Sequence, residues 1–161
     1  MRRYEPFIDG RFLAWTGATV KSVNPATGAV WSEVARCSVS EADLAIRSAE
    51  CAFREGVWAE ADGSARADIL DALADALEAR WEELVASEVH DNGKRISEVR
   101  GQFSGLHSWY RHFANEARKL AVKPQNNTVS GAISAAHFMP FGVVVAITPW
   151  NSPLMILAWK L

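Results

Sequence analysis

Hydrophobic residues recur with two different periodicities along the chain, and the point where the periodicity changes divides the chain into segments. Residues 1–37 consist of short runs with the hydrophobic pattern of β-strands, separated by turn sequences. Asp9-Gly10 within FIDGRF predicts a hairpin over 7–15, because Asp-Gly suits a two-residue turn. A second turn at 24–28 separates two further β-leaning runs. The front of the chain is therefore expected to form short strands.

Beyond Ser40 the hydrophobic residues recur every three or four positions, as they do in helices. Ser40 and Asp43 resemble a capping box and predict the start of a first helix. A second helix is predicted from near Ser64 to Asn92-Gly93, where glycine takes the left-handed conformation that ends helices. The stripe of the first helix is Ala42, Ile46, Ala49 and Phe53, and that of the second is Leu70, Leu73, Leu77 and Leu84.

The most regular pattern predicts one long third helix with a continuous buried seam. Its members are Ile96, Val99, Phe103, Leu106, Tyr110, Phe113, Ala117 and Leu120. A coiled-coil strand is the alternative, but the seam is short and contains aromatic residues. We therefore expect it to pack inside a globular domain.

The last segment predicts strands over 124–140 with a turn near Gly131, then a buried strand over 142–148 and a helix. Asn151 or Ser152 suits the cap of that helix, and Pro153 suits its first turn. The helix is almost wholly apolar and no residue closes it, while the strand lacks a following parallel partner. We therefore expect the chain to be the front part of a larger protein.

Composition excludes several classes of protein. The 161 residues are 49% hydrophobic and 22% charged with a net charge of -2, which argues against nucleic-acid binding. Two cysteines suggest no disulfide framework, and the arginine-rich start lacks an apolar leader, so a cytoplasmic location is expected. His107 and His112 are misaligned on a helix, and no metal site is expected. Residues 141–159 are long enough to span a membrane, but Pro149 and Pro153 interrupt them, which favours a buried strand and helix instead.

Taken together, PFGVVVAITPWNSPLMILAWKL at 140–161 resembles the aldehyde dehydrogenase superfamily, which has a Pro-x-Gly-Val-Val strand, a Pro-Trp-Asn-x-Pro turn and a Trp-Lys helix. FIDGRF at 7–12, VNPATGAVWSEV at 23–34 and VHDNGKR at 89–95 agree in order with other family segments. The resemblance covers nearly the whole chain. It implies an incomplete α/β fold: residues 1–123 from the cofactor-binding domain, 124–140 as an oligomerisation hairpin, and 141–161 as the first strand-turn-helix of a Rossmann-like core.

The resemblance also assigns roles to residues of the turn. Asn151 matches the side-chain amide that donates to the oxyanion formed when a cysteine attacks the aldehyde. Ile147, Thr148, Pro149 and Trp150 match the segment beside the nicotinamide ribose of NAD or NADP. Ser152, Ile156 and Trp159 match positions along the substrate tunnel. From spacing alone, Asn151 would be interpreted as a helix cap, and Trp150 and Ile156 equally suit plain core packing.

The catalytic cysteine and glutamate of the family would lie beyond this chain, since neither Cys37 nor Cys51 stands in the matching motif. The implied function is the N-terminal portion of an NAD(P)-dependent aldehyde dehydrogenase, a homo-oligomer through 124–140 that is inactive as 161 residues alone. The competing interpretation is a non-catalytic subunit or interaction module that associates with full-length subunits. Family members that hold a monovalent cation do so near positions matching Ser22 and Asp91.

Overall fold

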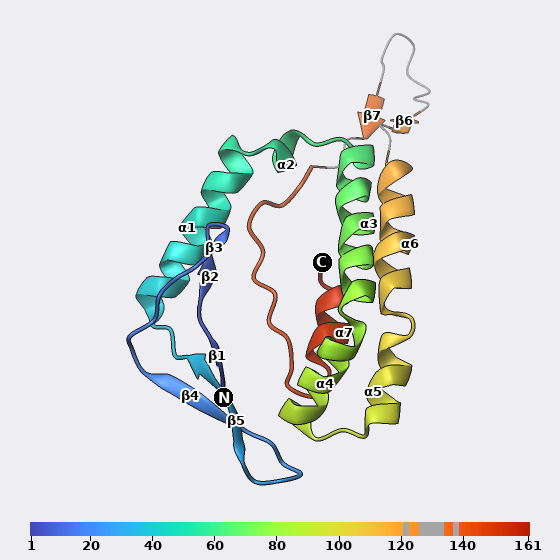
Figure 1. Ribbon diagram of the computed structural model, residues 1–161. Coiled ribbons are helices and arrows are strands. Elements are labelled where there is room, and N and C mark those ends of the chain that lie inside the picture. Colours follow the sequence, from blue (N-terminus) through green and yellow to red (C-terminus); the bar gives the residue numbers. More distant parts are fainter. Residues whose placement is uncertain (121–122, 126–133, 137–138) are drawn as a thin grey trace.

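A computed structural model of the chain describes residues 1–120, 123–125, 134–136 and 139–161. Short strands lie at the N-terminal end, and helices account for most of the rest (Figure 1). Helices α3 (Gly63–Ala79) and α6 (Leu106–Arg118) run side by side along one edge, α1 (Val39–Glu55) lies on the opposite side, and α7 (Pro153–Ala158) lies close to α3 and α6. The chain thus places its last helix against the α3–α6 pair.

Three strands form a small mixed sheet in the order β1 (Arg2–Tyr4), β5 (Val30–Ala35) and β4 (Thr19–Val23). β5 runs parallel to β1 and antiparallel to β4. The predicted turn between β4 and β5 is confirmed: the side chain of Asn24 accepts a hydrogen bond from the backbone of Ala26 at 2.9 Å.

The predicted N-terminal hairpin is also confirmed. β2 (Phe7–Ile8) pairs antiparallel with β3 (Arg11–Phe12) across Asp9-Gly10. Both turn residues have positive φ angles, 56° and 71°, as a two-residue hairpin turn of this hand requires.

The first predicted helix is present as α1 (Val39–Glu55), but its predicted cap is wrong. The capping box joins Ser38 and Glu41, two positions before the expected pair. Glu41 reaches back to the backbone N–H of Ser38 at 2.7 Å, a span that suits the longer glutamate side chain. None of the α1 residues is buried. The short helix α2 (Val57–Glu60) follows.

The second predicted helix is two helices, α3 (Gly63–Ala79) and α4 (Trp81–Asn92). The break falls at Arg80, whose backbone leaves the helical region at φ -111° and ψ 17°. No glycine or proline marks this break, so the leucine stripe predicted a continuous helix. The predicted end is confirmed, because Gly93 is left-handed with a φ of 74°.

The long third helix is likewise two helices, α5 (Ile96–Phe103) and α6 (Leu106–Arg118). The hydroxyl of Ser104 donates to the carbonyl of Gly101 at 2.7 Å, and this bond competes with the helical ladder at the break. The break rotates the buried stripe of α6 toward Ala114, and Phe113 remains 50% exposed. The predicted seam is confirmed from Val99 to Tyr110 and wrong at its two ends.

Two adjoining apolar clusters form the core. One contains Val85, Val99 and Phe103, and the other contains Ala74, Leu106, Tyr110 and Ala158. Leu154 on α7 (Pro153–Ala158) packs against both. The last helix is therefore anchored to the α3–α6 pair and to the α4–α5 pair at once.

The strand expected over 142–148 is not formed. Residues 141–149 belong to no helix or strand, and Val144 and Ile147 are 71% and 79% exposed. A strand is stabilised by a neighbouring strand, and within the described residues none lies beside this segment to pair with it. The sequence was β-prone, but the segment remains extended and solvent-exposed.

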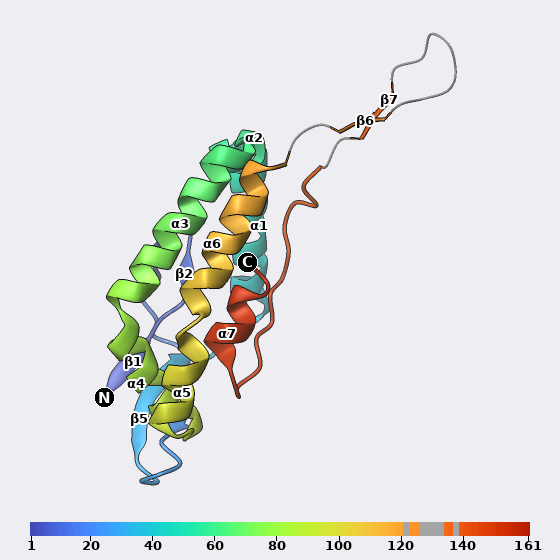
Figure 2. The same cartoon turned by 90° about the vertical axis from the view of Figure 1, so that its right-hand side faces the viewer.

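β6 (Lys123–Gln125) pairs antiparallel with β7 (Ser134–Ala136), which confirms strands within 124–140. Figure 2 shows the two strands beyond the end of the helix pair, away from the rest of the described chain. The turn expected near Gly131 lies outside the described residues. Among the described helices, none is long and apolar enough to cross a membrane.

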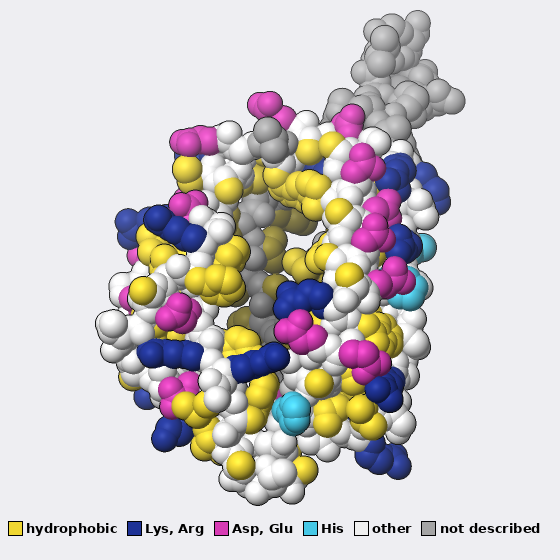
Figure 3. Space-filling view, in the orientation of Figure 1, with side chains coloured by type: hydrophobic (Ala, Val, Ile, Leu, Met, Phe, Trp, Pro, Cys, Tyr) yellow, Lys and Arg dark blue, Asp and Glu magenta, His cyan; other side chains and the backbone are white. Residues whose placement is uncertain are grey.

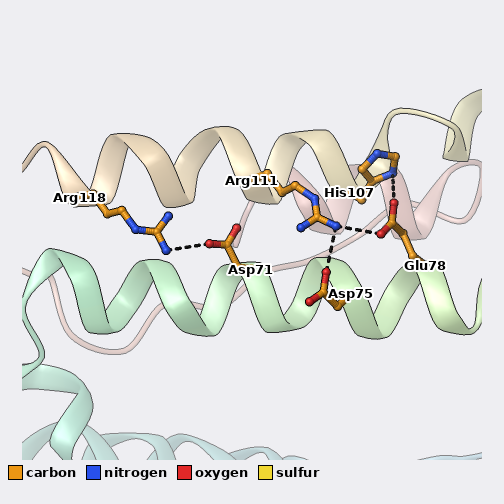
Figure 4. A network of polar contacts seen from close by, with 6 residues as sticks. All are labelled: Asp71, Asp75, Glu78, His107, Arg111 and Arg118. Carbon is orange, nitrogen blue, oxygen red and sulfur yellow. Dashed lines mark hydrogen bonds and ion pairs between the residues drawn. The ribbon is translucent and has the colours of Figure 1, made fainter.

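Hydrophobic side chains gather on both rims of a hollow between α1 and α3 (Figure 3). Outside it, charged side chains join α3 to α6: Arg111 bonds Asp75 and Glu78, and Arg118 bonds Asp71 (Figure 4). Exposed ion pairs of this kind contribute little stability each. The apolar contacts between the two helices hold the pair together.

Candidate active-site turn

The polar turn at 148–153 lies where α7 begins, beside the end of α4. Pro153 occupies the first position of α7, as predicted, and Ser152 is the N-cap residue. Ser152 makes no side-chain cap bond, because its hydroxyl is engaged elsewhere. Asn151 stands one position before the cap, so the helix-cap interpretation of Asn151 does not hold.

Two side chains fix the backbone carbonyl of Asn151. The side-chain amide of Asn92 donates to it at 3.3 Å, and the hydroxyl of Ser152 donates to it at 2.8 Å. The Asn151 residue itself is exposed. A tethered carbonyl with an exposed side chain leaves the amide of Asn151 available to a ligand.

A half-buried lysine reaches the turn from the loop after α4. The ammonium of Lys94 donates to the hydroxyl of Ser152 at 2.6 Å and to the side-chain carbonyl of Gln102 at 2.9 Å. Ser152 is only 4% exposed. The serine expected along the substrate tunnel therefore has its hydroxyl turned toward Lys94 in this structure.

Glu88 completes this group from the last turns of α4. Its carboxylate lies 3.6 Å from the ammonium of Lys94, and its side chain is 4% exposed. In the described part of the chain, neither carboxylate oxygen has a hydrogen-bond partner. Burial raises the pKa of Glu88, and the positive charge of Lys94 offsets only part of that effect.

We expect replacement of Glu88 by glutamine to change how stability depends on pH. A raised pKa means that the folded state binds the proton more tightly, so this contribution to stability is complete below the ordinary value of 4.5 and is lost as the pH rises through the raised pKa. Glutamine does not titrate. The free energy of unfolding of Glu88→Gln, measured in urea and compared with the unaltered chain, should therefore gain as the pH rises from about 4.5 toward 8.

Glu98→Gln, which alters an exposed carboxylate on α5, is the matched control for that series. A difference between Glu88→Gln and the unaltered chain that stays constant, or that falls as the pH rises, would contradict burial as the dominant influence on Glu88.

The residues expected to face a cofactor form the exposed side of the same turn. Ile147 and Trp150 are 79% and 78% exposed, and Pro149 is exposed. Thr148 is half-buried and lines a cleft of about 360 Å³ together with Ser32, Glu88 and other residues. The structure thus brings the expected cofactor residues and Asn151 together on one continuous segment.

The remaining expected substrate residues lie along α7 and just after it. Ile156 is half-buried. Trp159 is 53% exposed and packs edge-on against Trp109 of α6, with ring centres 6.0 Å apart. Trp159 is therefore held by another aromatic ring and still presents a surface to solvent.

Neither cysteine is placed as a nucleophile. Cys37 and Cys51 are both exposed and both lie outside the turn. Cys51 donates from its thiol to Glu55 at 3.2 Å, and this contact raises the pKa of the thiol and disfavours the thiolate.

The two positions linked above to a monovalent cation lie together. The hydroxyl of Ser22 donates to the carboxylate of Asp91 at 2.5 Å, and the indole N–H of Trp31 donates to Ser22 at 2.9 Å. Within the described residues, no group of three or more acidic, histidine or cysteine side chains has the arrangement of a metal site.

Comparison with known proteins decides the family. The model of the aldehyde dehydrogenase family matches residues 12–161. The chain belongs to the aldehyde dehydrogenase family. It is 36% identical to 2-hydroxymuconic semialdehyde dehydrogenase of Pseudomonas sp. (strain CF600), over 99% of this chain and 34% of that protein. It is also 36% identical to aminoacetaldehyde dehydrogenase of Pseudomonas aeruginosa, over 96% of this chain and 32% of that one.

Solved structures of the family agree with the fold. The NAD-dependent aldehyde dehydrogenase from Sinorhizobium meliloti superposes with a TM-score of 0.91 at 32% identity, over 97% of this chain and 32% of that one. Betaine aldehyde dehydrogenase from Staphylococcus aureus in complex with NAD+ superposes with a TM-score of 0.91 at 29% identity, over 97% and 31%. The chain therefore spans about a third of the length of the relatives it matches, and its architecture is that part of an aldehyde dehydrogenase fold.

The sequence pointed to Asn151 and its neighbours as candidates, but it gave no indication of Asn92 and Lys94, which contact the turn, or of Glu88, which pairs with Lys94. VHDNGKR was recognised only as the end of a helix. No local signal in VHDNGKR marks Lys94, because its partners Gln102 and Ser152 come from other segments of the chain.

Proposed function

We propose that this chain forms the N-terminal part of an NAD(P)-dependent aldehyde dehydrogenase that oxidises an aldehyde to a carboxylic acid. The observation that carries the proposal is the Pro-Trp-Asn-Ser-Pro turn. Its backbone is tied to α4 at the carbonyl of Asn151, while the residue itself stays exposed. An oxyanion donor requires a backbone held in place and an exposed side-chain amide, because a preorganised donor needs no rearrangement as charge develops.

Asn151 would donate from its side-chain amide to the oxyanion of a thiohemiacetal. That intermediate forms when a cysteine supplied by another part of the enzyme attacks the aldehyde carbonyl. Neither Cys37 nor Cys51 is proposed for this role, because both lie outside the turn and the thiol of Cys51 donates to Glu55. The contribution of this chain is electrostatic stabilisation, and the nucleophile and general base belong to the remainder of the enzyme.

The residues before Asn151 fit the nicotinamide end of NAD or NADP. Ile147 and Trp150 present apolar surface to solvent, and residues 141–149 leave their backbone outside any helix or strand. These features suit a flat ring and a ribose that hydrogen-bonds to backbone groups. Ile147, Thr148, Pro149 and Trp150 would hold the cofactor, which supplies hydride acceptance when bound.

Ile156 and Trp159 would face the aldehyde from α7. Ser152 contributes space more than polarity there, since its hydroxyl is already bonded to Lys94 and to the carbonyl of Asn151. The two relatives named above carry the names of aldehydes of different chemistry, so the substrate is assigned only as an aldehyde. A cytoplasmic location stays a prediction from the sequence.

Residues 124–140 support a second proposal, that the protein is a homo-oligomer joined through this segment. The paired strands β6 and β7 stand away from the helices (Figure 2), and the edges of a two-stranded ribbon offer backbone groups to another strand. If a 161-residue product exists by itself, the same segment would let it associate with full-length subunits without catalysis.

The test is to isolate the protein from its native source, measure its intact mass, and assay aldehyde-dependent NADH or NADPH formation. We expect a mass roughly three times the 17.7 kDa of this chain, from its one-third coverage of relatives, and turnover with at least one aldehyde. The purified 161-residue chain, assayed in parallel, should show none. A full-length protein without turnover on a broad aldehyde panel, or turnover by the isolated chain, would overturn the proposal.

A further inference from the structure

Three separate segments meet at the ammonium of Lys94. Glu88 approaches from α4, Gln102 from α5 and Ser152 from the turn before α7, at 3.6, 2.9 and 2.6 Å. The Lys94 side chain is only 17% exposed. A lysine that is largely withdrawn from water needs partners for its charge and its N–H groups: Gln102 and Ser152 accept hydrogen bonds from it, and Glu88 lies near enough to pair with its charge.

The contacts continue from Lys94 to the carbonyl of Asn151. The hydroxyl of Ser152 accepts from Lys94 and, with its own proton, donates to that carbonyl at 2.8 Å. Because the ammonium can only donate, it forces the hydroxyl proton toward the carbonyl. Asn92, two residues before Lys94, donates to the same oxygen at 3.3 Å.

We infer that Lys94 is a positioning residue that fixes the peptide between Asn151 and Ser152, and thereby the direction of the Asn151 side chain. The inference deepens the proposed function and rests on the role proposed there for Asn151. Lys94 itself touches neither aldehyde nor cofactor. It acts through Ser152, and Glu88 with Gln102 holds it in place.

The geometry of the helix start supports a positioning role over a purely local one. An N-cap serine ordinarily bonds a backbone N–H of its own helix, and Ser152 forgoes that bond. The turn is instead tied across the fold to the end of α4. The hydroxyl of Ser152 therefore bonds Lys94 and the carbonyl of Asn151 in place of a backbone N–H of α7.

The first experiment measures local order in the full 161-residue chain by NMR. The backbone N–H of Ile156 donates to the carbonyl of Ser152 at 3.0 Å, so its hydrogen exchange reports opening of the turn. Lys94→Met, which keeps the length of the side chain and removes the donor, should accelerate exchange at Ile156 roughly tenfold. It should also shift the Asn151 amide resonances, while exchange at buried Ala114 of α6 stays unchanged.

Two further variants distinguish positioning of the turn by Lys94 from a nonspecific loss of structure. Lys119→Met removes an exposed lysine and its contact with Glu116, and should leave Ile156 unaltered. Ser152→Ala should accelerate exchange at Ile156 as Lys94→Met does, and adding Lys94→Met to it should have no further effect. If Lys94→Met behaves as Lys119→Met, or if the two changes add in full, the inference is overturned.

The second experiment uses the dehydrogenase that contains this chain. Lys94→Met should lower kcat about tenfold with little change in KM for aldehyde or cofactor, and should have no effect once Asn151 is already alanine. Full activity of Asn151→Ala would refute the proposed role of Asn151, whereas the NMR exchange rates test the positioning of the turn separately. A fall in kcat that persists in the Asn151→Ala background would contradict action through Asn151.

Discussion

Replacing Asn151 by alanine in the dehydrogenase that carries this chain should lower kcat by about 10²–10³-fold, with KM for the aldehyde little changed. The amide of Asn151 would bond the substrate oxygen most strongly when that oxygen carries full negative charge. Losing it therefore raises the barrier by about 3–4 kcal/mol without weakening ground-state binding. Steady-state kinetics with the best aldehyde of the panel provide the measurement.

Asn151→Asp sharpens this test, because aspartate has nearly the same shape and an acceptor in place of the donor. It should be at least as inactive as Asn151→Ala, since its charge opposes the oxyanion. Asn115→Ala, at an exposed position on α6, should leave kcat unaltered. If Asn151→Ala retains kcat within about threefold, the oxyanion role is wrong.

The local elements of this chain were largely predictable, because local chemistry determines them. Asp9-Gly10 defined its hairpin and Gly93 ended its helix, since both positions need backbone angles that few residues tolerate. The break at Arg80 was not predictable in this way. It contains no glycine or proline, and only the backbone angles of Arg80 in the structure reveal it.

The segment 142–148 shows the other limit of sequence reasoning. Its β-branched residues favour an extended backbone, but a strand also needs a partner, and the structure assigns this segment to no strand. A sequence pattern reports the conformational preference of one segment, but it does not show whether another strand lies beside that segment.

The candidate site divides in the same manner. Asn151 and Trp150 stand in a dense local motif, and the family resemblance reached them directly. Lys94 is 58 residues from Ser152 along the chain, and Gln102 lies on yet another helix. Only the fold brings them together, so nothing in the sequence pointed to the residues that hold the turn in place. The sequence did indicate the residues that the turn exposes.

Replacing Phe103 by alanine should lower the free energy of unfolding by about 3–5 kcal/mol. Phe103 is 1% exposed, lies edge-on to Trp81 with ring centres 6.0 Å apart, and packs with Val85 and Val99. Its removal leaves a void among helices α4 and α5 and abolishes the aromatic contact. A loss of this size is a large share of the roughly 5–15 kcal/mol that stabilises a typical domain. Urea unfolding followed by circular dichroism measures it.

Phe113→Ala is the matched control, since it removes the same side chain from a position that is 50% exposed on α6. It should cost no more than about 1 kcal/mol, most of it from the ring contact with Trp109. Equal losses at the two positions would mean that the α4–α5 cluster is not the core described above.

The loss of Phe103 should also affect the candidate site, because Leu154 packs on the same cluster and is the third residue after Asn151. Phe103→Ala should therefore also accelerate hydrogen exchange at Ile156, because it weakens the anchor of α7.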